Sequence, residues 1–289
     1  MHCRICESPF LIRRFDIRHY SVFKCRVCHY TQINFAPSAA EINRIYDFRY
    51  FNNPKYINFR ARHQENTRRL KLLKPCLPKA GSRVLDYGCG TGDFIKLVQG
   101  DCDVWGYDVS KIAVCEAVSK NPELSGKITT SLSDCPAGRF DAVVMWDVIE
   151  HLSSPRDTLE DVLNLLKTDG FLILSTPNSG SKLARLMGRY WAFMTPPEHL
   201  GFFDKQTIHY CFEKLFHSSI ISWQSRGKWV SLAFLWYKIG RILFYSNHRR
   251  QNLMTHLKPL HKISVYVPSR DIQYVVVRNS KIFKVRSGI

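Results

Sequence analysis

The 289-residue sequence contains no run of about 18 uninterrupted apolar residues, which is the length that a membrane-spanning helix requires. No apolar segment stands near its start either, because Met1 is followed almost at once by a cysteine pair, so we expect no secretory leader. The ten cysteines are therefore expected to be metal ligands or buried thiols in a cytoplasmic, reducing environment. With 45% hydrophobic residues, the chain can bury a sizeable core.

Acidic residues are scarce compared with basic ones. The chain has 24 Asp and Glu against 42 Lys and Arg, a formal net charge of +18. Such a charge attracts polyanions, whether nucleic acid or an anionic membrane surface. A basic but merely solvated surface fits equally well, so the charge by itself does not choose a partner.

Two cysteine pairs open the chain. Cys3-x-x-Cys6 is followed after 18 residues by Cys25-x-x-Cys28, a spacing typical of a four-thiolate zinc site. Zinc would supply the folding energy that about 30 residues cannot obtain from a core of their own. We therefore predict a structural zinc ribbon over residues 1–30. A redox pair is the alternative, and the duplicated spacing argues against it.

Residues 31–80 are expected to form a helical linker or cap. Apolar positions recur at helical spacing over Ala39–Tyr50 and Tyr56–Leu73. Pro75 and Gly81 end the second helix and mark a boundary.

From residue 81 to the end, short apolar segments alternate with helical patterns. Strands are expected at Val84–Tyr87, Val104–Tyr107, Ala142–Trp146, Phe171–Ser175, Ile220–Trp223 and Gln273–Arg278. Helices are expected at Asp93–Gln99, Lys111–Lys120, Arg156–Leu166 and Thr207–Phe216. The alternation predicts an α/β domain over residues 81–289, with a largely parallel sheet covered by helices on both faces.

A glycine-rich turn, Gly88-Cys89-Gly90-Thr91-Gly92, follows the first of these strands. Such turns let the backbone approach a ligand closely, but dinucleotide sites have them too. Asp86, two residues before the turn, would repel a pyrophosphate and can pair with a cationic amino group. Asp108, about 20 residues after the turn, suits hydrogen bonding to two ribose hydroxyls. A helix-capping aspartate and ordinary turn glycines are the alternative interpretation.

These motifs resemble class I methyltransferases that use S-adenosylmethionine (SAM). The resemblance extends from the segment Val84–Gly92 through Phe140–Leu152 to Lys167–Asn178. It implies a Rossmann-like seven-stranded sheet whose last strand is antiparallel. The cofactor residues that it implies are Asp86, Gly88, Gly90, Gly92 and Asp108, and Trp146 is expected to pack against the purine.

The acceptor side is expected to lie after the fourth and fifth strands. Asp147-x-x-Glu150-His151 resembles the Glu-x-x-Glu-His of ubiquinone-pathway O-methyltransferases and small-RNA 2′-O-methyltransferases. That resemblance implies a divalent-metal site made by Asp147, Glu150, His151 and His199, the last from a substrate lid over residues 179–203. A metal-free histidine base remains an alternative, as does a structural role for Glu150 and His151 at a helix start.

The segment 229–250, between the expected sixth and seventh strands, is unusually apolar and ends in His248-Arg249-Arg250. Three interpretations stay open: an interfacial helix docked on an anionic membrane surface, a buried lid helix, or a dimer contact. The first would make the protein peripheral to the membrane.

Together these observations predict a SAM-dependent methyltransferase that modifies a hydroxyl of a small-molecule or lipid- or glycan-linked acceptor. A zinc ribbon followed by a SAM domain resembles bacterial methyltransferases of cell-surface glycans and secondary metabolites. An RNA methyltransferase is one alternative, although no Asn/Asp-Pro-Pro-Tyr/Phe tetrapeptide follows the fourth strand. A non-catalytic SAM-binding module is the other.

Overall fold

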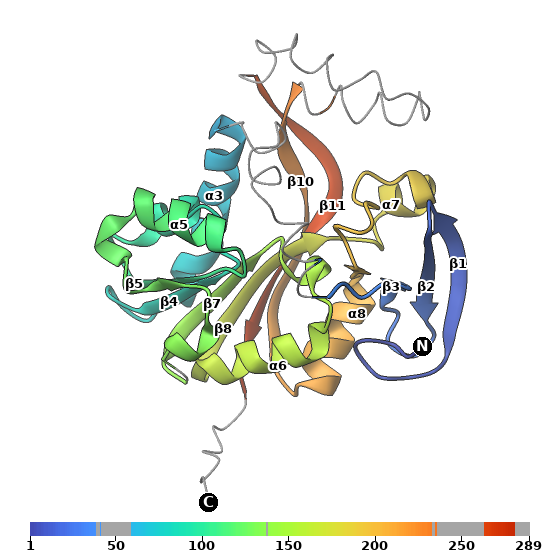
Figure 1. The fold of residues 1–289 in the computed structure, drawn as a ribbon, viewed down its shortest axis with the longest axis horizontal. Helices are drawn as coiled ribbons and strands as arrows, with labels where there is room; N and C mark the ends of the chain where they lie inside the picture. The colour runs from blue at the N-terminus through green and yellow to red at the C-terminus, as the bar shows by residue number, and fades with distance from the viewer. Residues whose placement is uncertain (39–40, 42–58, 137, 233–234, 236–262, 281–289) are drawn as a thin grey trace, which may run out of the picture.

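A computed structural model describes residues 1–38, 41, 59–136, 138–232, 235 and 263–280, and its described strands form two sheets (Figure 1). The larger sheet has seven strands in the order β10-β11-β8-β7-β4-β5-β6. Their bounds are β4 Arg83–Tyr87, β5 Asp103–Tyr107, β6 Ile128–Thr129, β7 Phe140–Trp146, β8 Leu166–Pro177, β10 Ser219–Ser231 and β11 Ser264–Arg278.

The chain direction in the large sheet matches the predicted fold. Strands β4, β5, β6, β7 and β8 all run parallel to one another. Strand β11 runs antiparallel to both β8 and β10. The predicted Rossmann-like architecture with an antiparallel last strand is confirmed.

Helices cover both faces of this sheet. Their bounds are α3 Phe59–Leu73, α4 Asp93–Val98, α5 Lys111–Lys120, α6 Pro155–Leu165, α7 Lys182–Met187 and α8 Lys205–His209. Successive residues of β7 point to opposite faces: Val143 packs into one core with α6, and Val144 packs into another with α4. Because both faces are covered, β7 is apolar at nearly every position rather than at alternate ones.

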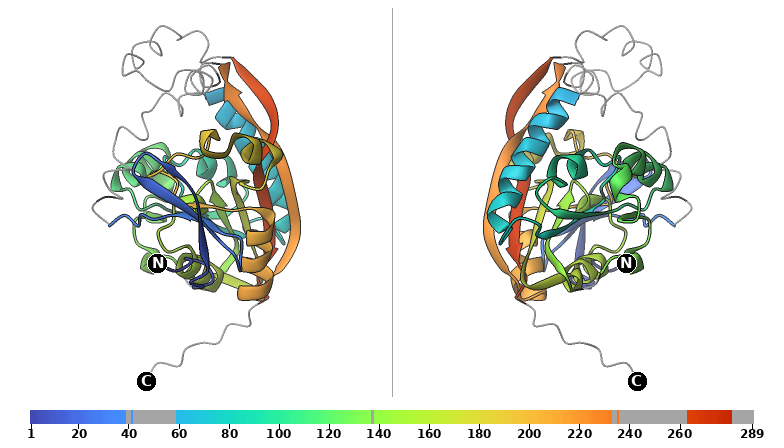
Figure 2. Two further views of the ribbon diagram at one scale, coloured as in Figure 1. Left: turned by 90° about the vertical axis from the view of Figure 1, so that its right-hand side faces the viewer. Right: turned by 90° about the vertical axis from the view of Figure 1, so that its left-hand side faces the viewer.

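Helix α3 lies along the antiparallel pair β10 and β11 (Figure 2). Its bounds fall within the predicted helix Tyr56–Leu73. The other helix predicted in the linker, Ala39–Tyr50, lies almost entirely outside the described residues, as does most of segment 229–250. Within the described chain, no helix is long and apolar enough to cross a membrane.

One boundary of the predicted apolar insert was wrong. Its first three residues, 229–231, are the end of β10 and pair with residues 264–266 of β11. The pairing of β10 with β11 continues into the segment where the sequence becomes strongly apolar. Trp229 is therefore a strand residue. The insert therefore starts after Ser231.

The smaller sheet is formed mainly by the segment that carries the two cysteine pairs. It has the order β1-β2-β3-β9, with β1 Leu11–Ile17, β2 Tyr20–Cys25, β3 Thr31–Ile33 and β9 Gly201–Phe202. We call residues 1–33 the ribbon; it includes strand β3 and is therefore three residues longer than the predicted 1–30. The fourth strand of the smaller sheet, β9, comes from the predicted lid and not from the ribbon.

The four predicted cysteines come together. The sulfurs of Cys3 and Cys28 lie 3.3 Å apart, those of Cys6 and Cys25 lie 3.5 Å apart, and all four lie within 4.8 Å of one another. A tetrahedral zinc ion with bonds of about 2.3 Å holds its sulfurs about 3.8 Å apart, so the donor set fits zinc. Three of the four side chains are buried.

We expect the protein to carry about one zinc ion per chain and to lose it in the double variant Cys25→Ser/Cys28→Ser, because two of the four thiolates are removed. The melting temperature should fall as well, since zinc binding contributes directly to ribbon folding. Elemental analysis and thermal denaturation measure both. Cys115→Ser, at an exposed cysteine on α5, is the control and should retain its zinc. Undiminished zinc in the double variant would contradict the assignment.

Candidate active site

The glycine-rich turn joins β4 to α4, and its three glycines have left-handed backbone conformations. Gly88, Gly90 and Gly92 have φ values of 80°, 52° and 77°. Space requires glycine too: a Cβ on Gly88 would lie 2.5 Å from a methyl group of Val148. The turn is fixed from the neighbouring strand, because the amides of Gly88 and Cys89 both donate to the carbonyl of Tyr107. Its glycines are thus needed for both conformation and close approach.

Asp108 lies directly beside this turn. One carboxylate oxygen accepts a hydrogen bond of 2.9 Å from the Gly90 amide, and the other accepts one of 2.9 Å from the Ser110 amide. Burial raises the pKa of Asp108, and these two bonds work against that rise. The carboxylate is therefore held in one orientation at the mouth of the turn, where a ribose can meet it.

Asp86, the last but one residue of β4, lies on the other side of the turn and is 2% exposed. Burial raises its pKa to about 7; the charge of Arg69 lowers it, and that of Asp108 raises it further. The raised pKa means that the surroundings of Asp86 supply too little positive charge to balance the ionised carboxylate. A cationic ligand group bound here would supply it.

Trp146 and Arg69 lie against each other at the carboxyl end of β7. Trp146 ends β7 and packs edge-on against Phe94 of α4, with ring centroids 5.4 Å apart. The guanidinium of Arg69, on α3, lies 5.3 Å from the Trp146 ring centroid. No motif in the sequence marks Arg69, which stands among other basic residues of an amphipathic helix. Only the packing of α3 brings it to the carboxyl end of the sheet.

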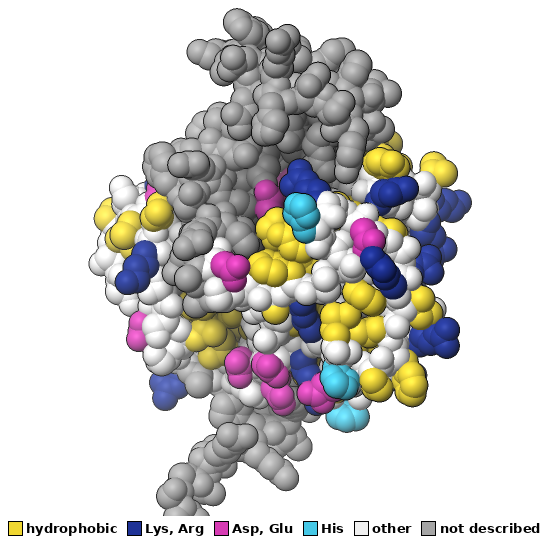
Figure 3. Space-filling model, turned by 45° about the vertical axis from the view of Figure 1, so that its right-hand side comes forward, with side chains coloured by type: hydrophobic (Ala, Val, Ile, Leu, Met, Phe, Trp, Pro, Cys, Tyr) yellow, Lys and Arg dark blue, Asp and Glu magenta, His cyan; other side chains and the backbone are white. Residues whose placement is uncertain are grey.

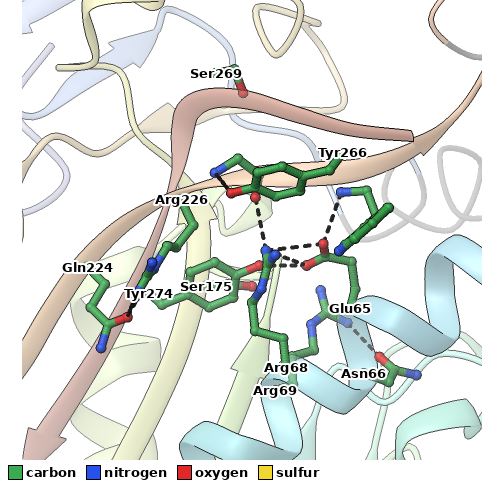
Figure 4. A network of polar contacts seen from close by, with 12 residues as sticks. Glu65, Asn66, Arg68, Arg69, Ser175, Gln224, Arg226, Tyr266, Ser269 and Tyr274 are labelled. Carbon is green, nitrogen blue, oxygen red and sulfur yellow. Dashed lines mark hydrogen bonds and ion pairs between the residues drawn. The ribbon is translucent and has the colours of Figure 1, made fainter. Parts of the chain in front are cut away.

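A buried carboxylate anchors α3 in that place. Glu65 accepts hydrogen bonds from Tyr274 Oη at 2.7 Å, from the Trp229 amide at 3.0 Å and from Arg68 at 3.2 Å. Figure 4 shows Glu65 and Arg68 of the helix reaching toward the antiparallel strands, and Arg69 hydrogen-bonded to Asn66 of the same helix. The network fixes the rotation of α3, and with it the direction of Arg69.

The acceptor side contains three of the four predicted metal ligands. Glu150, His151 and His199 bring one ligand atom each to within 4.8 Å of the others. His151 Nδ1 lies 2.7 Å from the Glu198 carbonyl oxygen, and His199 Nδ1 lies 2.7 Å from the Phe193 carbonyl oxygen. Because a carbonyl only accepts, each Nδ1 carries the proton, and the lone pair of each neutral ring is on Nε2. Metal-binding and general-base histidines share this arrangement.

Glu150 is 2% exposed and accepts a hydrogen bond of 2.8 Å from Thr176 Oγ1. Burial raises its pKa to about 8, with a further rise from the charge of Asp147. A carboxylate so deeply buried needs a cation or a proton beside it.

Asp147 was predicted to belong to the metal site, and this prediction was wrong, because its carboxylate does not join the Glu150, His151 and His199 group. Its carboxylate forms an ion pair of 2.5 Å with Arg69 and accepts a hydrogen bond of 3.0 Å from Ser175 Oγ. Burial would raise the pKa of Asp147, but the charges of Lys228 and Arg69 outweigh it and lower the pKa to about 2. Asp147 has a left-handed backbone, with φ of 57°, and its side chain meets α3 instead of the histidines.

Lys228 is a second cation that no sequence motif marks. It lies on β10, and its ammonium is 5.5 Å from the centroid of the Phe193 ring. Its charge lowers the pKa of both Asp147 and Glu150. The pairing of β10 with β11 brings it from late in the chain to the acceptor side.

Residues 59–215, more than half of the chain, match the family model described as a methyltransferase domain. The chain belongs to this methyltransferase family. The resemblance to class I SAM-dependent methyltransferases is thereby confirmed.

Relatives of this methyltransferase include ubiquinone biosynthesis O-methyltransferases. That of Albidiferax ferrireducens is 30% identical over 43% of this chain and 52% of its own. That of Alkalilimnicola ehrlichii is 32% identical over 42% and 52%, respectively. The chain thus spans about half the length of these relatives. The [4+2]-cyclase SpnF shares the fold, with a TM-score of 0.53 and 18% identity over 84% of this chain and 97% of the cyclase.

Replacing Asp86 with asparagine should stabilise the SAM-free methyltransferase at pH 8. The folded pKa of about 7 lies above the usual value of about 3.9. Asp86 therefore disfavours folding increasingly as the pH rises from about 4 to 7, and fully above 7. We expect Asp86→Asn to raise the melting temperature at pH 8, with a gain that shrinks steadily toward pH 5.

The control for this prediction is Asp103→Asn, at the opposite end of the neighbouring strand. Burial raises the pKa of Asp103, but hydrogen bonds from Lys127 and Arg83 outweigh it and lower the pKa. This change should therefore lower the melting temperature at pH 8. A wild-type protein as stable as Asp86→Asn at every pH would contradict the buried-charge assignment.

Proposed function

We propose that this methyltransferase transfers the methyl group of SAM to a hydroxyl of a small-molecule or lipid- or glycan-linked acceptor. The observation that carries the proposal is the Glu150, His151 and His199 group beside the glycine-rich turn. The relatives named as O-methyltransferases support the choice of a hydroxyl. A cytoplasmic or membrane-peripheral location stays a prediction.

On the cofactor side, we assign the methionine amino group to Asp86 and the two ribose hydroxyls to Asp108. The turn of Gly88, Gly90 and Gly92 would line the cofactor, and Trp146 would contact the purine. We also assign the methionine carboxylate to Arg69, a choice supported by its contacts with Asp147 and Trp146 and by the effect of its charge on Asp86.

Methyl transfer is an in-line displacement, in which an oxygen–carbon bond forms while the carbon–sulfur bond breaks. The sulfonium becomes a neutral thioether, and the acceptor hydroxyl gives up its proton. His151 or His199 can take that proton at Nε2, since a carbonyl holds the Nδ1 proton of each ring. Lys228 lies where it can pair with negative charge on the acceptor.

The same three residues fit a divalent cation. Two imidazole nitrogens and one carboxylate form a donor set suited to zinc, iron or cobalt rather than to magnesium. Such a cation would lower the pKa of a bound acceptor hydroxyl and offset the buried charge of Glu150. The ribbon cysteines are a separate, structural site.

Asp108→Ala should weaken SAM binding by about 100-fold, because two charge-assisted hydrogen bonds to the ribose are lost. Isothermal titration calorimetry measures the change. Asp103→Asn serves as the control, since it lies at the far end of the same strand and should leave the affinity unchanged. An Asp108→Ala protein that binds SAM as tightly as the wild type would defeat the assignment.

His199→Gln should lower turnover by at least about 100-fold while the SAM affinity stays the same, because general-base or metal assistance is lost. Turnover is followed as transfer of a tritiated methyl group to lipid, glycan, small-molecule and RNA fractions of cells. Label that enters RNA would replace the small-molecule acceptor with nucleic acid. Tight SAM binding without label in any fraction would favour a non-catalytic module.

EDTA distinguishes a metal-assisted reaction from a metal-free base. If the Glu150 group holds a divalent cation, EDTA should stop turnover, and cobalt should restore it while the zinc content measured by elemental analysis stays constant. Full turnover in EDTA would leave the histidine base as the mechanism.

A further inference from the structure

The ribbon and the acceptor side share a strand. Strand β9 consists of two residues only, Gly201 and Phe202, and pairs antiparallel with Gln32 and Thr31 of β3. The Ile33 amide extends the pairing by donating a hydrogen bond of 3.1 Å to the Leu200 carbonyl. His199 immediately precedes Leu200 in the chain.

Leu200 also bonds in the other direction. Its amide donates a hydrogen bond of 2.8 Å to the carbonyl of Glu150. One residue earlier than His199, the Glu198 carbonyl accepts the hydrogen bond from His151 Nδ1. The segment Glu198–Leu200 is therefore clamped between the ribbon strand β3 and the helical turn Ile149–His151.

A hydrogen-bonded path connects this clamp to the cysteine site. Gln32, at the centre of β3, is fully buried. Its side-chain oxygen accepts from the Arg4 amide at 2.9 Å, and its side-chain nitrogen donates to the His2 carbonyl at 3.0 Å. His2 and Arg4 flank Cys3, so the first cysteine turn and the strand that holds β9 are fixed to each other.

Packing fixes the spacing between the two strands. Tyr30 is fully buried and lies against Phe203, with ring centroids 4.9 Å apart. A Cβ on Gly201 would overlap the Tyr30 hydroxyl and lie 2.5 Å from the ring carbon that bears it. Just after β9 in the chain, Asp204, the N-cap of α8, forms an ion pair of 3.2 Å with Lys24 of β2.

We propose that the ribbon is a positioning element of the acceptor site. Through the β3–β9 pairing it holds His199 against Glu150 and His151, and the cysteine site stabilises the strand that does so. The cofactor turn lies at the ends of β4 and β5, outside this clamp. The effect on turnover rests on the proposed function; the effect on the geometry of the three-residue group does not.

Gly201→Ala tests the proposal. The added methyl group overlaps Tyr30 and should push β9 away from β3. We expect faster amide hydrogen exchange in residues 198–203 and weaker binding of cobalt by the Glu150 group, with SAM affinity unchanged. Turnover should fall by about 100-fold, the loss that a displacement of about 1 Å can cause. The visible absorption spectrum of cobalt shows whether it is bound by nitrogen and oxygen ligands or by sulfur. It therefore distinguishes the Glu150 group from the cysteine site, which is filled with zinc.

The second variant is Gly201→Ala/Tyr30→Leu, in which the smaller side chain makes room for the new methyl group. It should recover slow exchange in 198–203, cobalt affinity and most of the turnover. Gly100→Ala is the matched control, because a Cβ there meets no atom within 4 Å, and it should behave as the wild type.

Three results would overturn the proposal: unchanged exchange and cobalt affinity in Gly201→Ala, equal loss of SAM affinity and cobalt affinity, or no recovery in the double variant. Absence of methyl transfer in the wild type would remove the proposed function alone. Exchange and cobalt affinity would still decide whether the ribbon positions His199.

Discussion

Three carboxylates are buried at the edge of the large sheet where the parallel strands end. The surrounding structure is organised by the need to compensate their negative charge. Asp86 is the last but one residue of β4, Asp108 follows β5, and Glu150 follows β7, so parallel pairing places all three at the same edge. Burial raises the pKa of each. Backbone amides, Arg69 and Lys228 provide part of the compensation; the rest is left to ligands, and this is what makes the edge a binding site.

The two cations reach this edge from opposite ends of the chain. Arg69 comes from the helix before the first strand, and its direction is set by Glu65 one turn earlier. Lys228 comes from β10. Between them, Asp147 is kept ionised and forms an ion pair with Arg69. The cofactor side and the acceptor side are thus electrostatically linked, although separate motifs encode them.

The ribbon gives the acceptor side a rigidity that two-residue β9 could not have alone. An isolated strand of this length forms too few hydrogen bonds to hold a fixed place. Pairing with β3 gives it a partner that the cysteine site stabilises. Figure 3 shows most of the visible Lys and Arg side chains on the right-hand part of the face in view, with hydrophobic side chains beside them.

Much of this protein could be predicted from the sequence alone, because the evidence is local. The glycine-rich turn at Gly88–Gly92, the apolar strands of the large sheet and the two Cys-x-x-Cys pairs each depend on residues a few positions apart, and each lies where it was predicted. Tertiary structure alone decided the rest. Asp147 leaves the predicted metal group because α3 offers it Arg69, Lys228 enters the site through strand pairing, and β9 joins the ribbon across the chain. Contacts between distant segments depend on how helices and strands pack, and no periodicity or spacing in the sequence records that packing.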